Sequence, residues 1–262
     1  MRLLVVEGNT KETWKNREAR GGVPFHKRFL TMLKTLQPNA IVDVAFPADQ
    51  ESLLPSIKKL ETFDGILWTG SSLFVNNPSA DVGRQLTFAE DIFNSGVPFY
   101  GSCWGMQIAV VVAGGKVNKC SNGREFGITS SIDLTEAGKI HPYFRGRKNE
   151  FKALSVHLDE VVSLPENTVV LAENNHSKVQ ALTIRHKKST FFGVQYHPEF
   201  TTSDMAFLTR YLSNNLMEEK LFKSEEEIEN FALKLEKKNG LPESVINYSL
   251  HIQEVKFWLD NI

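Results

Sequence analysis

This sequence of 262 residues has no large excess of charge of either sign, only two cysteines and no long apolar run. Lys and Arg number 30 against 31 Asp and Glu, which argues against a dedicated nucleic-acid or anionic-membrane surface, because such surfaces concentrate positive charge. The longest apolar run extends from Ile108 to Ala113, far short of a bilayer span. We therefore expect no nucleic-acid partner and no membrane segment.

Cysteine occurs only at Cys103 and Cys120, which excludes a disulfide framework and a zinc cluster and makes the reducing cytoplasm the expected location. The histidines show no metal-ligand spacing, so the sequence predicts no metal site and no cofactor. Near the N-terminus, one positive charge and a short apolar run are followed directly by Glu7, a pattern typical of a first buried strand rather than a signal peptide.

Up to Gly115, short β-branched apolar runs alternate with amphipathic segments, which predicts βαβ crossovers and a mostly parallel sheet flanked by helices. Residues 11–22 are charged and are interpreted as a solvated connection, with the rim of a pocket as the alternative. We expect strands over residues 3–6, 41–46, 65–69 and 97–100, and helices over 25–36, 53–60, 85–93 and 106–113.

Beyond Gly115 the apolar runs follow one another closely, which predicts antiparallel additions to the sheet. We expect one domain over residues 1–215 and a C-terminal helical extension over 216–262, with a last helix over 243–259. The added strands are expected over residues 126–134, 152–156, 161–164, 169–172, 179–184 and 191–196, followed by a helix over 202–212.

The most informative local pattern is Gly101-Ser102-Cys103-Trp104-Gly105, between an expected strand and an expected helix. Small residues two positions before and after a nucleophile permit the sharp strand-to-helix turn of a nucleophile elbow. The start of a helix favours the thiolate, and the Trp104 N–H suits an oxyanion hole. A small residue packed at a tight turn is the alternative, and the pentapeptide alone does not decide between them.

A second motif, His197-Pro198-Glu199, follows the last expected strand. A histidine can take the thiol proton on one ring nitrogen while a carboxylate orients the other nitrogen. Residues two apart in an extended segment point the same way, so Glu199 can approach His197. Together with the upstream cysteine, this motif predicts a catalytic triad of Cys103, His197 and Glu199.

The sequence resembles the class I (triad-type) glutamine amidotransferases over about residues 1–215, and within them the glutaminase domain of GMP synthase and its free-standing relatives. The similarity rests on residues 101–107 (GSCWGMQ) and 193–199 (GVQYHPE), with support from residues 124–127 (REFG) and 156–161 (VHLDEV). This resemblance implies an α/β, flavodoxin-like fold. It also implies attack of a cysteine on a γ-carboxamide, release of ammonia and hydrolysis of a γ-glutamyl thioester.

Carried over by position, the resemblance makes Cys103 the nucleophile, His197 the general base and acid, and Glu199 its orienting carboxylate. It places Gly70 and Trp104 in the oxyanion hole, and Gln107 and Ser71 at the substrate. Two departures affect substrate choice: residues 70–72 read Gly-Ser-Ser where the family has Gly-Gly-Pro, and Leu158 replaces a glycine. Cys120 is interpreted as a structural thiol, and His157 as either part of a substrate loop or a structural histidine.

Three functions remain open at this stage. The first is a glutaminase that passes ammonia to a synthetase partner, because the sequence has no glycine-rich phosphate loop for a synthetase of its own. The second is a self-sufficient hydrolase of γ-glutamyl amides or peptides. The third is a regulatory protein without turnover, which the intact Cys103, His197 and Glu199 disfavour.

Overall fold

A computed structural model describes residues 1–77 and 79–262. Its strands are β1 (Arg2–Val6), β2 (Ile41–Ala45), β3 (Gly65–Trp68), β4 (Phe99–Ser102), β5 (Lys116–Lys119), β6 (Glu125–Ile128), β7 (Ile132–Leu134), β8 (Glu150–Phe151), β9 (Leu154–His157), β10 (Asp159–Ser163), β11 (Thr168–Glu173), β12 (Ala181–His186) and β13 (Ser189–Val194). Its helices are α1 (Lys11–Ala19), α2 (Phe25–Leu36), α3 (Ile57–Leu60), α4 (Ala80–Ser95), α5 (Trp104–Val112), α6 (Glu136–Ile140), η1 (Pro142–Phe144), α7 (Thr202–Tyr211), α8 (Ser213–Glu218), α9 (Glu225–Lys237), α10 (Glu243–Ile246), α11 (Tyr248–His251) and α12 (Gln253–Leu259).

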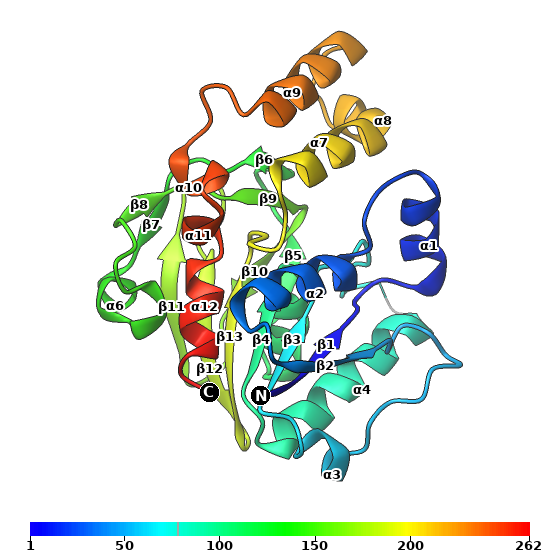
Figure 1. The fold of residues 1–262 in the computed structure, drawn as a ribbon, viewed down its shortest axis with the longest axis vertical. Coiled ribbons are helices and arrows are strands. Elements are labelled where there is room, and N and C mark those ends of the chain that lie inside the picture. Colours follow the sequence, from blue (N-terminus) through cyan, green and yellow to red (C-terminus); the bar gives the residue numbers. More distant parts are fainter. Residues whose placement is uncertain (78) are drawn as a thin grey trace.

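The main sheet has nine strands in the order β2-β1-β3-β4-β13-β12-β11-β7-β8 (Figure 1). Strands β2, β1, β3, β4 and β13 pair in parallel, and the remaining pairs are antiparallel. The start of this order is that of flavodoxin-like folds, in which ligands bind at the carboxyl ends of the parallel strands. The expectation of a mostly parallel sheet with antiparallel additions is confirmed, but the expected strands 152–156 and 161–164 are not among these additions: they correspond to β9 and β10, which pair with β6 and β5 in two separate two-stranded sheets.

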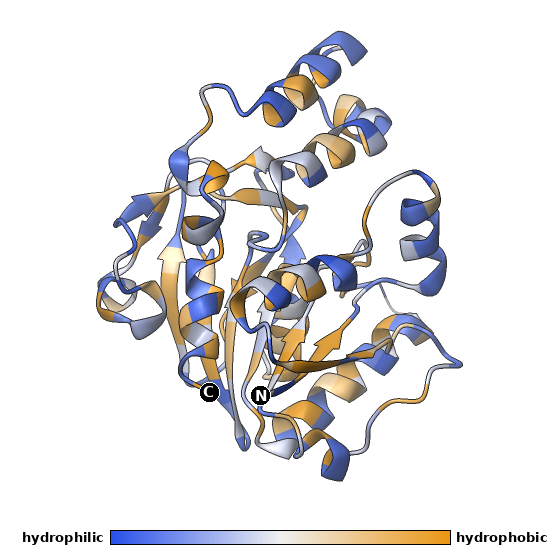
Figure 2. Ribbon diagram, in the orientation of Figure 1, coloured by the Kyte–Doolittle hydropathy of each residue, from blue (hydrophilic) through white to orange (hydrophobic). Residues whose placement is uncertain are grey.

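Helices cover both faces of the main sheet, and alternate residues of β1 show why. Leu4 and Val6 face a core that includes α4 and α5, whereas Leu3 and Val5 face a second core that includes α2 and α12. Figure 2 shows mostly hydrophobic residues along the strands and a mixture of hydrophobic and hydrophilic residues along α2, α4 and α12. The last helix is therefore part of the second core, where Trp258 is almost fully buried.

A third apolar cluster joins α7, α9 and the two-stranded β6-β9 sheet beside the carboxyl ends of the parallel strands. The N-cap of α7 is a complete capping box, in which Thr201 and Asp204 bond reciprocally. This cluster places the end of α7 next to the edge of the sheet where a ligand is expected. Among the described residues, none of the helices is long and apolar enough to span a membrane.

Three local expectations are wrong. Residues 11–19 form helix α1, which begins at a Thr10 N-cap but is polar on all sides and so lacks the apolar periodicity that predicts a helix. The expected strand 126–134 is two strands, β6 and β7, that belong to different sheets. The expected last helix is three short helices, because Asn247 has an extended backbone and caps α11 with its side chain.

Candidate active site

Cys103 lies in a sharp turn between β4 and α5, with a backbone φ of 48°. Its N–H donates to the carbonyl of Val194 at 2.8 Å, which ties the turn to β13. A Cβ atom added to Gly101 would lie 2.6 Å from the backbone of Gly105, and one added to Gly105 would lie 2.7 Å from the carbonyl oxygen of Trp68. The turn therefore requires glycine on both sides of the cysteine, as a nucleophile elbow does.

The loop that follows β13 brings His197 and Glu199 to the same edge of the sheet. Nδ1 of His197 lies 2.7 Å from Oε1 of Glu199, and both residues are about 1% exposed. The Ser102 hydroxyl donates to the same Oε1 atom at 3.1 Å. Among the described residues Nε2 of His197 forms no hydrogen bond, which leaves that ring nitrogen available for proton exchange with Cys103.

The imidazole of His197 is fixed on several sides. Its ring stacks on Phe200 with centroids 4.2 Å apart, and Nε2 of His251 lies 3.2 Å from its backbone carbonyl oxygen. Burial alone would lower the pKa of His197, but Glu199 and Cys103 favour the cation and raise this pKa above its usual value. The site is therefore built to stabilise an imidazolium beside the cysteine.

Gly70 follows β3 and lies against the histidine ring. A Cβ atom added there would come within 2.7 Å of Cε1 of His197, so this position has no room for a side chain. The Ser71 hydroxyl donates to the carbonyl of Gly8 at 2.9 Å and accepts from the N–H of Leu73 at 3.1 Å. Ser71 lines the pocket, but its hydroxyl holds the loop in place.

Two further side chains, which the sequence analysis did not identify, fix the same loop. Gln85 accepts from the indole N–H of Trp104 at 2.8 Å and donates to the carbonyl of Gly8 at 3.1 Å. Asn9 accepts from the N–H of Ser72 at 2.9 Å. Both are polar side chains at buried positions. The sequence alone does not show that they are buried, so it could not identify them. These bonds connect the elbow to the loop after β3.

Backbone N–H groups without partners among the described residues lie at the start of α5 and in the loop after β3. Within the described residues the N–H groups of Gly70, Ser71 and Trp104 donate no hydrogen bond to the protein. Trp104 is the first residue of α5, and Gly70 and Ser71 lie in the loop that follows β3 at the same sheet edge. Free N–H groups at a helix start and an adjacent loop can stabilise an oxyanion.

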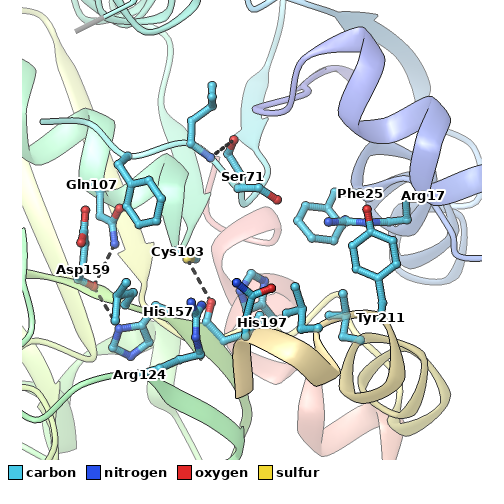
Figure 3. A pocket seen from close by; sticks show the side chains of 18 residues that line it. Arg17, Phe25, Ser71, Cys103, Gln107, Arg124, His157, Asp159, His197 and Tyr211 are labelled. Carbon is cyan, nitrogen blue, oxygen red and sulfur yellow. Dashed lines mark hydrogen bonds between the residues drawn. The ribbon is translucent and has the colours of Figure 1, made fainter. Parts of the chain in front are cut away.

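Ser71, Cys103 and His197 line a pocket of about 180 Å³, which is smaller than the sites of drug-sized ligands and suited to a small metabolite (Figure 3). Gln107, which sequence reasoning placed at the substrate, lines this pocket and donates to the carbonyl of Asp159 at 3.1 Å. The pocket is lined by Arg17, Phe25, Ser71, Ser72, Leu73, Phe74, Cys103, Gln107, Arg124, Val156, His157, Leu158, Asp159, His197, Leu208, Tyr211, Leu212 and Asn215.

One wall of the pocket rests on a buried polar network. Both ring nitrogens of His157 face acceptors, Oε2 of Glu125 and the carbonyl of Asp159, each at 3.0 Å. Burial raises the pKa of Glu125, but hydrogen bonds from His157, Gln180 and Asn174 outweigh it and hold the pKa below its usual value. His157 thus positions the strand that carries Asp159, and burial raises the pKa of the Asp159 carboxyl.

Cys120 lies outside this site. Its thiol faces the carbonyl of His176 at 3.6 Å and is not among the atoms that line the pocket. Within residues 1–77 and 79–262, no three His, Cys, Asp or Glu side chains group in a metal-binding arrangement.

The two thiols differ in their expected reactivity towards iodoacetamide. Burial raises the pKa of Cys120 to about 11, so this thiol is almost fully protonated at neutral pH, whereas Cys103 lines the pocket beside His197, which can take its proton. We expect Cys103 to be alkylated at least about 100-fold faster at pH 7, and Cys120 to react faster as the pH approaches 11. Peptide mass spectrometry over time checks this, and equal labelling of both cysteines at pH 7 would contradict it.

His251 predicts acid sensitivity of the fold. Burial and Arg147 lower its pKa to about 4, below the usual value near 6.5, so the unfolded chain takes up this proton first as the pH falls. Stability should therefore decrease between pH 6.5 and 4, by up to about 3 kcal/mol from this group. His251→Gln keeps an N–H donor for the His197 carbonyl and should flatten this slope in urea unfolding; an unchanged slope would refute the assignment.

An α/β fold with a cysteine at the strand-to-helix turn, a His–Glu pair and free backbone donors is the arrangement of cysteine-dependent acyl-transfer enzymes. Comparison with known proteins specifies the family. The family model described as glutamine amidotransferase class-I matches residues 30–218. The chain belongs to this family, and it is an amide-hydrolysing enzyme.

Individual relatives agree with this assignment. The chain is 37% identical over 237 residues to a γ-glutamyl-L-1-hydroxyisopropylamide hydrolase from a Pseudomonas species, covering 88% of this chain and 79% of that protein. It is 36% identical over 145 residues to the glutamine-hydrolysing GMP synthase subunit of Sulfolobus acidocaldarius, covering 55% and 71%. The crystal structure of a glutamine amidotransferase from Thermotoga maritima has the same fold, with a TM-score of 0.72 at 16% identity over 100% and 97% of the two chains.

Proposed function

We propose that this protein is a self-sufficient hydrolase of γ-glutamyl amides, with Cys103 as its nucleophile. The observation that carries the proposal is the pairing of Nδ1 of His197 with Glu199 beside the Cys103 elbow, in a pocket of metabolite size. Similarity over 88% of the chain to a hydrolase of a γ-glutamyl amide supports this substrate class. Leu158 lines the pocket at a position where the family has a glycine, so its side chain changes the shape of the pocket.

The proposed reaction has two halves. Cys103 Sγ attacks the γ-carbonyl carbon as His197 takes the thiol proton, and the N–H groups of Trp104 and Gly70 stabilise the oxyanion. The C–N bond then breaks, and His197 gives its proton to the leaving amine. Water, deprotonated by His197, attacks the γ-glutamyl thioester and releases glutamate and the free thiol. Glu199 keeps the ring oriented and stabilises its cation throughout.

A second candidate is a glutaminase that supplies ammonia to a synthetase partner. The match to the Sulfolobus GMP synthase protein favours it, although that match covers 55% of this chain. The two candidates share their chemistry and differ in the amine that leaves. A partner-dependent glutaminase should be slow alone and specific for glutamine.

The test measures glutamate release by the purified chain from L-glutamine and from a series of γ-glutamyl alkylamides and dipeptides. We expect kcat/KM to be at least about 100-fold higher for a γ-glutamyl compound than for glutamine, without any partner protein. Slow hydrolysis of glutamine alone would reject the proposal in favour of the glutaminase. The Cys103→Ala variant is the control for a contaminating hydrolase.

Replacing Gly70 tests the oxyanion loop. In Gly70→Ala the new methyl group meets Cε1 of His197, whose ring is held by Glu199 and Phe200, so the loop or the ring must move. We expect kcat to fall about 100-fold, because small displacements of catalytic groups have effects of this size. Gly83→Ala is the matched control: Gly83 lies in α4 with no atom near its added Cβ, and kcat should stay unchanged. Equal kcat in both variants would refute this role.

A further inference from the structure

Arg17 is a charged residue of the pocket that the mechanism does not use. It comes from α1, is 4% exposed, and its guanidinium lies 3.8 Å from the ring centroid of Phe25. Its Nε and Nη1 atoms are buried and form no hydrogen bond within the described residues. A buried cation whose donors lack partners is costly, so such a residue is typical of a binding site.

Nearby carboxylates are engaged with other groups. Glu7 accepts hydrogen bonds from the backbone N–H of His26, at 2.8 Å, and from Nδ1 of the same residue, at 2.7 Å. Asp204 caps α7 and forms an ion pair with Arg28. Burial lowers the pKa of Arg17, and the charges of Glu7, Tyr211 and Asp204 oppose that decrease without bonding to it. An anion brought by a ligand would complete the hydrogen bonding of Arg17.

The second arginine of the pocket differs in this respect. Arg124 forms a bidentate pair with Glu219, with distances of 2.7 and 2.8 Å. Its charge is therefore compensated by the protein itself. Of the two arginines that line the pocket, Arg17 is the one with donors that have no partner within the described residues.

Arg17 also lies at a defined end of the pocket. Figure 3 shows Arg17, Phe25 and Tyr211 on one side, Gln107 and Asp159 on the other, and Cys103 between them. A substrate whose reacting carbon lies at Cys103 extends in both directions from that atom. If Gln107 contacts the glutamyl part, the amine that leaves must point towards Arg17.

We propose that Arg17 binds a carboxylate on the leaving amine, which makes γ-glutamyl amino acids better substrates than neutral γ-glutamyl alkylamides. This inference rests on the proposed γ-glutamyl hydrolase function and specifies its substrate class. Guanidinium groups suit it, because they bind carboxylates with two parallel hydrogen bonds. The ring of Phe25 packs against the guanidinium and stabilises it at this position.

The test compares γ-glutamylglycine with γ-glutamylglycinamide, which differ only in that the leaving amine ends in a carboxylate or in a neutral amide. The wild-type kcat/KM should be at least about 10-fold higher for γ-glutamylglycine. In Arg17→Met it should fall about 30-fold for γ-glutamylglycine, mostly through KM, and change less than about threefold for the glycinamide. Arg17→Lys should keep part of the preference, because it keeps the charge and loses the bidentate geometry.

Lys15→Met is the control, because it removes an equal charge from an exposed position of the same helix and should change neither substrate. Equal losses for both substrates in Arg17→Met, or a wild-type enzyme that does not distinguish them, would overturn the inference. The wild-type comparison and Arg17→Lys decide the question even if Arg17→Met does not fold. Hydrolysis of neither compound by the wild-type enzyme would instead reject the proposed function.

Discussion

Cys103→Ala is expected to lower the hydrolysis of γ-glutamyl amides by about 10⁴-fold or more while the protein stays folded. The alanine removes the atom that attacks the carbonyl carbon, and the remaining donors and His197 do not replace a nucleophile. The side chain is small and its N–H bond to Val194 is made by the backbone, so the elbow keeps its shape. Initial rates of glutamate release and a thermal unfolding curve measure both effects.

Cys120→Ala is the matched control, since it removes the chain's other thiol from a buried position outside the pocket. Its rate should stay within about twofold of the wild-type rate. If Cys103→Ala turned over at the wild-type rate, Cys103 would not be the nucleophile, whatever the geometry of the elbow.

Trp258→Ala is expected to have the largest effect on stability. The indole is about 1% exposed and its ring centroid lies 5.8 Å from that of Tyr100 in the second core, against the strand that precedes Cys103. Removing a buried tryptophan costs about 3–5 kcal/mol through lost burial and the cavity left behind. We expect this decrease in the free energy of unfolding from urea titration, with a transition about 10 °C lower on heating.

Phe257→Ala provides the comparison, because it truncates a neighbouring aromatic residue of α12 that is only half-buried. It should cost no more than about 1 kcal/mol. If Trp258→Ala were equally mild, α12 would not form part of the core, and residues near the C-terminus would be dispensable for the fold.

The parallel part of the fold was predictable because the apolar runs over residues 3–6, 65–69 and 97–100 alternate with amphipathic segments. Helix α1 was not, because its polar sequence lacks the apolar periodicity that predicts a helix. The division of residues 126–134 between two sheets depends on pairing with β9 and β11, which are distant in sequence. Local pattern thus predicts the elements but not contacts between remote segments.

The predicted site residues come together because β3, β4 and β13 end at one edge of a parallel sheet. Gly70, Cys103 and His197 each follow one of these strands, so their positions could be inferred from the sequence. The groups that hold them, including Gln85 and His251, come from helices elsewhere in the chain. The burial of Arg17 could not be inferred for the same reason, since it depends on contacts such as that with Phe25, although the rim of a pocket was the alternative interpretation of residues 11–22.

The central claim, that hydrolysis proceeds through a γ-glutamyl thioester on Cys103, is tested most directly by trapping with hydroxylamine. The purified enzyme is given several γ-glutamyl compounds with different leaving amines and a fixed hydroxylamine concentration, and the ratio of γ-glutamyl hydroxamate to glutamate is measured. A common thioester requires the same ratio for every substrate, and no hydroxamate from Cys103→Ala. A ratio that varies with the leaving amine, or hydroxamate formed without Cys103, would contradict the account.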